Sequence, residues 1–173
     1  MKRYILTLFL SLVLFAGSAF ATGYTPQVKE KSEVEKHMQS IAKSKPTEID
    51  YTYISATMFK QMLSILDANI DVQGGSFPLA SIKSLRQFTT TGSTGYRILS
   101  EAMKPFLQED ETVMGMELMA LNKEGGAMTA IYGGQGNILL ISDEEDEMSV
   151  LFIVGLGYDE FKTLYESGVN FDF

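Results

Sequence analysis

Apolar residues recur every three or four positions over much of the chain up to residue 107, and every second position after residue 112. The first spacing is typical of amphipathic helices and the second of strands. Four strand-like runs follow one another: Val113 to Leu121, Ala127 to Tyr132, Asn137 to Ser142 and Met148 to Val154. The segments between these runs are short, so neighbouring strands must be antiparallel. The pattern predicts a four-stranded antiparallel meander in the C-terminal half.

Four segments have the spacing of amphipathic helices: Ser32 to Lys45, Ala56 to Leu66, a segment that begins at Ser93 or Thr94, and Asp159 to Ser167. Ser32 and Glu35 have the spacing of a capping box, and Ser55 is a suitable N-cap for the second helix. Pro105 should kink or end the third helix within its last turn, because proline lacks the backbone donor.

Two further strands are expected in the N-terminal half, at Tyr51 to Ile54 and at Ile82 to Thr89. The chain therefore has the pattern of an α+β protein, with the meander and an additional N-terminal strand packed against amphipathic helices on one sheet face. We divide it into a leader over residues 1–21, a flexible lead-in with the first helix over residues 22–50, and one α+β domain over residues 51–173.

The strands at 138–141 and 150–154 are apolar on both faces, which a sheet with one solvated face does not require. Phe152 has the same parity as Val150, so we expect it to face the helices while Leu151 and Ile153 face away. The first helix, a second copy of the protein or a ligand would then cover the other face. The candidate interaction face consists of Leu151, Ile153, Leu139 and Ile141.

The first 21 residues have the features of a secretory signal. Lys2 and Arg3 precede an apolar core of about a dozen residues, followed by small residues that end at Ala21. A membrane-spanning helix needs about 20 apolar residues, so we expect cleavage after Ala21 and no stable membrane anchor. The predicted location is the periplasm or the exterior of the cell. Removal of Lys2 and Arg3 makes a chain of net charge -8 still more acidic.

Composition excludes several chemistries. The chain has no cysteine and one histidine, so disulfides, thiolate metal sites, cysteine nucleophiles and multi-histidine metal clusters are excluded. The negative charge argues against a nucleic-acid partner, because binding to phosphates needs a clustered cationic surface. The sequence predicts no cofactor and no metal. It leaves enzymatic activity open, with a non-enzymatic protein favoured.

One weak candidate for an anion or ligand site is the loop of Thr91, Gly92, Ser93, Thr94 and Gly95, which joins a strand to a helix. It lacks the lysine of a phosphate-binding loop, and it is one residue shorter than a nucleophile elbow. Helix capping is therefore the favoured role of this loop.

Three other features have simpler structural explanations. The five carboxylates of Asp143 to Glu147 lack the alternating layout of a calcium loop, and we expect a solvated turn. Met114 and Met116 should share one strand face and Met119 the other, which favours core packing over copper binding. His37 has no nucleophile motif to serve and is expected at the surface.

Several core and cap positions resemble those of the bacterial domain of unknown function 4252. They are Tyr53-Ile54-Ser55 with Met58 and Leu63, Ile82-Lys83-Ser84-Leu85, Met116-Glu117-Leu118-Met119, and Phe152-Ile153-Val154-Gly155. The resemblance covers about residues 51–164. It implies a small exported α+β protein of the bacterial envelope without an assigned activity or catalytic residues. Many such proteins look like lipoproteins, whereas this chain has no cysteine to carry a lipid.

These observations favour a non-enzymatic binding or interaction module that uses an apolar sheet face. Its expected partner is another protein or a second copy of itself. The alternative is a small periplasmic hydrolase or ligand carrier, with a pocket built from the loops at residues 89–95 and 133–137.

Overall fold

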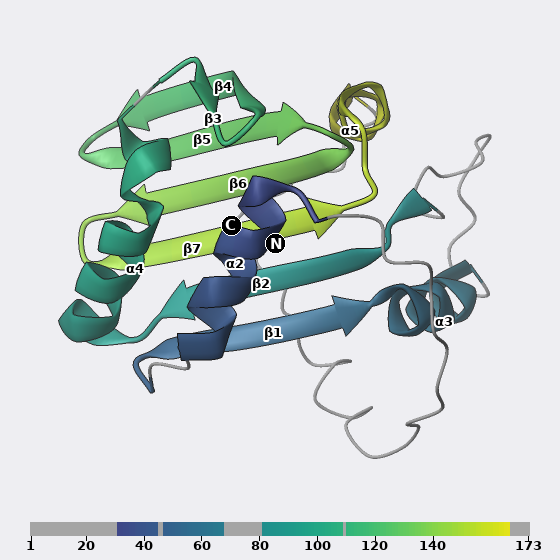
Figure 1. The fold of residues 1–173 in the computed structure, drawn as a ribbon, viewed down its shortest axis with the longest axis horizontal. Helices are drawn as coiled ribbons and strands as arrows, with labels where there is room; N and C mark the ends of the chain where they lie inside the picture. Colours follow the sequence, from purple (N-terminus) through teal and green to yellow (C-terminus); the bar gives the residue numbers. More distant parts are fainter. Residues whose placement is uncertain (1–30, 45–46, 68–80, 109, 167–173) are drawn as a thin grey trace.

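The computed structural model describes residues 31–44, 47–67, 81–108 and 110–166. Its centre is a seven-stranded antiparallel sheet in the order β1-β2-β7-β6-β5-β4-β3 (Figure 1). The strands are β1 (Ile49–Ser55), β2 (Ser84–Thr90), β3 (Thr112–Val113), β4 (Met116–Glu124), β5 (Ala127–Gly134), β6 (Asn137–Glu144) and β7 (Glu147–Val154). The expected leader, its cleavage at Ala21 and the lead-in up to residue 30 lie outside the described residues.

The predicted C-terminal meander is confirmed, because β4, β5, β6 and β7 pair in sequence order. The expected strand at 113–121 is wrong at its beginning, since Met114 and Gly115 form a turn between β3 and β4. Both residues have a positive φ, 51° and 75°, which a continuous strand does not allow. Glycine suits this turn also because a Cβ at Gly115 would collide with the Gln135 side chain.

The two expected N-terminal strands are confirmed as β1 and β2. They pair over seven consecutive positions, from Ile49 opposite Thr90 to Ser55 opposite Ser84. β2 also pairs with β7, so Thr89 lies opposite Ser149. β7, the last of the described strands, therefore joins the β1–β2 pair to the rest of the meander.

The helices are α2 (Glu33–Ser44), α3 (Ala56–Asp67), α4 (Gly92–Leu107) and α5 (Tyr158–Glu166). The predicted capping box is confirmed, because the Ser32 N–H donates to Glu35 Oε2 at 2.9 Å and the Glu35 N–H donates to Ser32 Oγ at 3.3 Å. Ser55 caps α3 by accepting the Met58 N–H at 3.3 Å. Pro105 lies in the last turn of α4, which ends two residues later, as expected.

Helices pack on both sheet faces, whereas the sequence analysis expected them on one. The helices α2 and α4 lie across the face shown in front in Figure 1. We call this the α2–α4 face; its core includes Val34, Met38 and Phe152, all fully buried. On the opposite α3–α5 face, Phe59 and Phe161 pack with Leu151 and Ile153. The first helix therefore belongs to the main core, and the expected domain boundary at residue 50 falls inside β1.

Candidate functional site

The four residues expected to form one interaction face lie on opposite sheet faces. Leu139 is opposite Phe152, and Ile141 is opposite Val150, so both lie in the core of the α2–α4 face. Leu151 and Ile153 lie in the core of the α3–α5 face instead. The two-residue turn between Glu144 and Glu147 sets this register, because it pairs even positions of β6 with odd positions of β7. The expected grouping is therefore wrong.

None of these four side chains presents an open apolar surface. Leu139 and Ile141 are fully buried, and Leu151 and Ile153 are 6% and 3% exposed. Both sheet faces are thus covered at these positions within a single chain. A binding surface has to be sought elsewhere on the molecule.

The loop from Thr91 to Gly95 packs onto the chain just before β1. The Thr91 N–H and hydroxyl both donate to the carbonyl oxygen of Glu48, at 3.0 and 2.9 Å. Gly95 is buried against the same carbonyl, which a Cβ at this position would strike. The expected cap at Ser93 or Thr94 is wrong, because α4 begins at Gly92 with Thr91 as its N-cap residue. Thr91 thus holds the loop to Glu48 and does not leave its hydroxyl for a ligand.

The first turn of α4 lies in acidic surroundings. Burial raises the pKa of the Tyr96 hydroxyl above its ordinary value, and the hydrogen bond to Asp143 and the charge of that carboxylate raise it further. Asp146 acts in the same direction. These two acids belong to the run at the β6–β7 turn, so this end of α4 repels a further anion.

The loops of the alternative pocket lie at opposite ends of the sheet. Thr89 shares a transverse row with Ser149 and Ser142, whereas Asn137 begins β6 and lies opposite Val154. The two rows lie five positions apart along β6, and the loop beyond Thr90 lies further out, so about 20 Å separates the two loops. One pocket cannot be built from both.

The remaining candidates have structural roles. His37 is half-buried, where the surface was expected, and its Nε2 lies 2.8 Å from the carbonyl oxygen of Ala102 on α4. Met116 is buried on the α2–α4 face and Met119 packs on the other, as predicted. In the described part of the chain, no group of three or more His, Asp or Glu side chains is placed to hold a metal ion.

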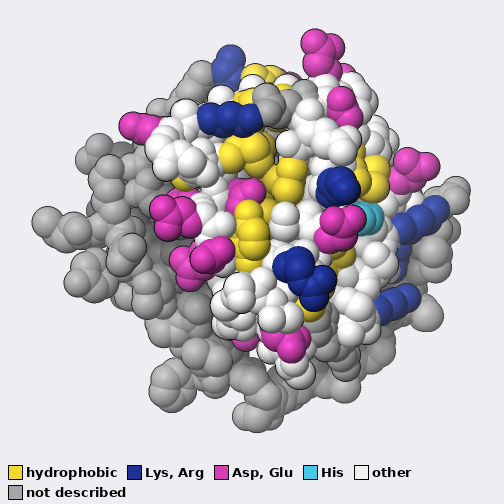
Figure 2. Space-filling view, turned by 90° about the vertical axis from the view of Figure 1, so that its left-hand side faces the viewer, with side chains coloured by type: hydrophobic (Ala, Val, Ile, Leu, Met, Phe, Trp, Pro, Cys, Tyr) yellow, Lys and Arg dark blue, Asp and Glu magenta, His cyan; other side chains and the backbone are white. Residues whose placement is uncertain are grey.

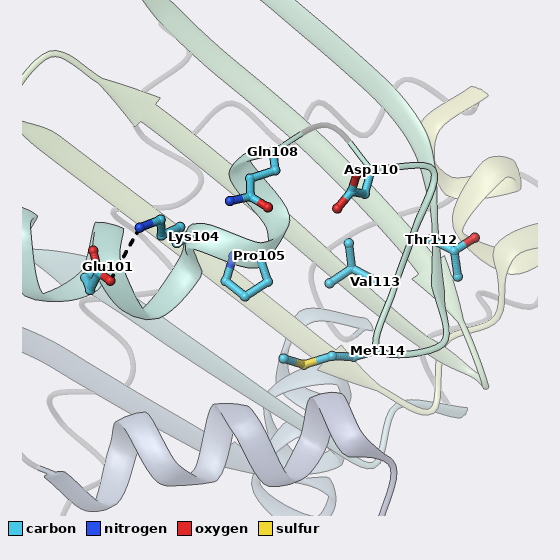
Figure 3. A pocket seen from close by; sticks show the side chains of 8 residues that line it. All are labelled: Glu101, Lys104, Pro105, Gln108, Asp110, Thr112, Val113 and Met114. Carbon is cyan, nitrogen blue, oxygen red and sulfur yellow. Dashed lines mark ion pairs between the residues drawn. The ribbon is translucent and has the colours of Figure 1, made fainter.

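A shallow depression of about 530 Å³ lies between the end of α4 and the β3–β4 turn (Figure 3). Pro105, Val113 and Met114 contribute its apolar lining, and charged and polar side chains complete it. Lys104 lies 3.8 Å from the Glu101 carboxylate, and both side chains are more than half exposed. The depression is open and its one cation already has an acidic neighbour, so it makes a poor ligand site.

On the side of the molecule where α4 lies, hydrophobic side chains form narrow strips among charged and polar ones (Figure 2).

A more specific arrangement lies at the other edge of the sheet, where Tyr51, Tyr53 and Arg86 form what we call the Tyr–Arg cluster. Tyr53 lies opposite Arg86, and Tyr51 lies opposite Phe88. The Tyr51 and Phe88 ring centroids are 5.0 Å apart. Because Phe88 belongs to the core of the α2–α4 face, the cluster lies on that same face. The two tyrosines are 39% and 47% exposed, so both rings are accessible from this face.

The Arg86 guanidinium lies between the two tyrosines. Its central carbon is 4.7 Å from the centroid of the Tyr53 ring, within the range of a cation–π contact. Its Nη1 donates to the Tyr51 hydroxyl at 2.8 Å. Its Nε is buried without a hydrogen-bond partner. Among the described residues, no carboxylate is observed in an ion pair with Arg86.

This cluster was not among the sites predicted from the sequence. The alternation of Tyr51 and Tyr53 was visible, and it placed both rings on one strand face. The position of Arg86 depends on the register between β1 and β2, which are separated by 28 residues, and no local pattern encodes that register.

Comparison with known proteins gives no match to a family model, a curated protein or a solved structure. The likeness to the domain of unknown function 4252 therefore stays a prediction. In the part of the chain that the structure describes, no helix combines the length and the apolar character needed to cross a membrane.

Proposed function

We propose that this protein is a non-enzymatic binding module of the bacterial envelope that holds a carboxylate-bearing ligand at the Tyr–Arg cluster. The observation that carries this proposal is the position of Arg86 between two exposed tyrosines, without a described carboxylate partner. In a chain of net charge -8, acidic side chains outnumber basic ones, so an arginine that forms no ion pair with any described carboxylate is notable.

The chemistry of the cluster suits a carboxylate. A guanidinium has five N–H donors in one plane, and one of them is used by Tyr51. Two parallel N–H donors among the remaining four match the two oxygens of a carboxylate. The exposed rings of Tyr51 and Tyr53 add contact area around the charge, and aromatic side chains with arginine are typical of binding hot spots.

Titration with a blocked glutamate, N-acetyl-glutamate amide, tests the recognition of the carboxylate. We expect its addition to shift the NMR signal of the Arg86 Nε–Hε group, and N-acetyl-glutamine amide to leave that signal in place. The R86Q variant should lose the response of the neighbouring β1 amides. R97Q is the matched control, because Arg97 is an exposed arginine on α4 and belongs to neither strand of the cluster. Equal responses to glutamate and glutamine would contradict the proposal.

The envelope location is a separate part of this proposal. It rests on the short apolar leader that ends at Ala21, and the mass of the protein recovered from cells tests it. A chain that begins at Thr22 in the envelope fraction supports export. A full-length chain recovered from the cytoplasm would contradict it.

A further inference from the structure

The two edges of the sheet differ in how they are protected against further pairing. The β3 edge has two residues, and the adjacent β4 contains a register shift between Leu118 and Ala120. The β1 edge has seven residues in unbroken register with β2. Proline, lysine and bulges are the usual means of protecting an edge, and β1 has none of them. Asp50 is its one charged residue.

The backbone of β1 is suited to accept another strand. Every second residue of an antiparallel edge strand directs its N–H and C=O groups away from its neighbour. Among the described strands, β1 pairs with β2 and with no other. An extended peptide that lies along this edge would therefore complete a ladder of backbone hydrogen bonds, as in recognition by strand addition.

The Tyr–Arg cluster lies directly beside this edge. Arg86 is on the second strand, but its guanidinium lies over the Tyr53 ring and bonds to the Tyr51 hydroxyl, so it extends toward the outer strand. An added strand would run about 4.8 Å beyond β1. Its side chains opposite Tyr51 or Tyr53 would point to the same face as the guanidinium, and an acidic one of them would be within reach of it.

We propose that β1 accepts an extended segment of a partner protein as an eighth strand, with an Asp or Glu side chain of that segment bound by Arg86 between Tyr51 and Tyr53. This inference rests on the proposed function and adds the class of ligand, an acidic peptide in β-conformation. The alternate side chains of the segment would face Thr52 and Asp50, where a second acid would be repelled.

A second copy of this chain fits the site less well. If two β1 strands paired with each other, they would present Ile49, Tyr51, Tyr53 and Ser55 to the α2–α4 face. None of these side chains carries a charge, so Arg86 would still have no carboxylate from the added strand. Charge complementarity therefore favours an acidic segment of another protein.

The test uses the full chain and the blocked heptapeptide acetyl-Thr-Val-Thr-Glu-Thr-Val-Thr-amide, with binding followed by backbone NMR. Two isomers of the peptide carry N-methyl groups on the odd or on the even amides. Only one edge of a bound strand faces β1, so we expect one isomer to lose binding by about tenfold or more and the other to retain it. A peptide with Gln in place of Glu should lose about tenfold as well.

Protein variants complete the design. R86Q and Y53A should weaken binding of the parent peptide, whereas R97Q and Y158A should not, because Tyr158 is an exposed tyrosine on α5. Shifts of the β1 amide signals in the parent protein show where the peptide binds. Unchanged spectra for the core residues of each variant show that the variant retains the fold.

The outcomes separate the two proposals. If glutamate is needed but both methylated isomers bind like the parent, strand addition is overturned and carboxylate binding stands. If methylation matters but glutamate does not, both proposals fail as stated. No binding at millimolar peptide overturns strand addition. If the protein self-associates through β1 and the peptide does not displace this association, strand addition by an acidic partner is overturned in favour of a second copy of the chain.

Discussion

The Tyr132 hydroxyl on β5 donates a 2.8 Å hydrogen bond to the carbonyl oxygen of Phe106 in the last turn of α4. The two rings also meet edge to face, with centroids 5.2 Å apart. The last carbonyl groups of a helix have no partner within the helix, and burial without one is costly. Tyr132 therefore satisfies the end of α4 from the sheet, close to the point where Pro105 brings the helix to its end.

Replacement of Tyr132 by Phe should lower the free energy of unfolding by about 1 to 3 kcal/mol, because it leaves the Phe106 carbonyl buried and loses this hydrogen bond. Urea unfolding monitored by circular dichroism measures the change. Y158F is the control, since Tyr158 is 52% exposed. A Y132F variant as stable as the parent would show that another group satisfies the carbonyl.

Truncation of Phe152 or Ile153 to Ala should destabilise the protein in both cases. The two side chains lie in separate cores on opposite sheet faces, and both are buried. We expect a loss of about 3 to 5 kcal/mol for F152A and about 2 to 5 kcal/mol for I153A. L121A, at an exposed position of β4, is the control. An I153A variant with native stability and altered association would restore the interaction face inferred from the sequence.

Replacement of Glu145 by Asn should stabilise the β6–β7 turn. Glu145 has φ 49°, a left-handed conformation that asparagine adopts at lower cost. We expect a gain of about 1 kcal/mol and a rise in Tm of about 2 to 4 °C. E145Q removes the same charge but keeps the side-chain length, so the difference between the two variants reports the backbone effect. Equal Tm values for the two would assign any gain to charge alone.

Ionisation of Tyr96 should make stability fall at high pH. Its pKa is raised in the folded protein by burial and by Asp143. The neutral Tyr96 side chain therefore adds its full contribution to the free energy of unfolding below about pH 10, and this contribution is lost as pH rises through the folded-state pKa. A spectroscopic pH titration of tyrosinate absorbance should show one component at high pH that is absent in Y96F. In D143N the same component should move to lower pH. Identical titrations of the parent and Y96F would refute this assignment.

Local features of the fold were predictable from the sequence. Ser32 with Glu35 and Ser55 before α3 marked two helix starts, because caps depend on residues within one turn. The meander was predictable for a similar reason, since short connections leave antiparallel neighbours as the only geometry. The turn at Met114 and Gly115 was not predicted, because one glycine inside an alternating apolar run indicates a bulge as readily as a turn.

Long-range features were not predictable in this way. The pairing of β2 with β7 joins residues 60 positions apart, such as Thr89 and Ser149, and nothing local indicates it. The placement of Arg86 over Tyr53 depends on such pairing as well. The faces of Leu139 and Leu151 would have followed from the sequence if the acidic run had been interpreted as a two-residue turn.

The pairing of β2 with β7 also determines when the sheet can be completed during synthesis. A chain that ends before residue 147 contains the β1–β2 pair and the β4–β6 strands, but it lacks the strand that joins them. Pairing of β2 with β7 closes a loop of about 60 residues, and the entropy cost of this closure makes it slow compared with hairpin formation. The nascent chain therefore acquires its complete sheet only after β7 has been made, and until then the β1–β2 pair and the β4–β6 strands have no strand between them.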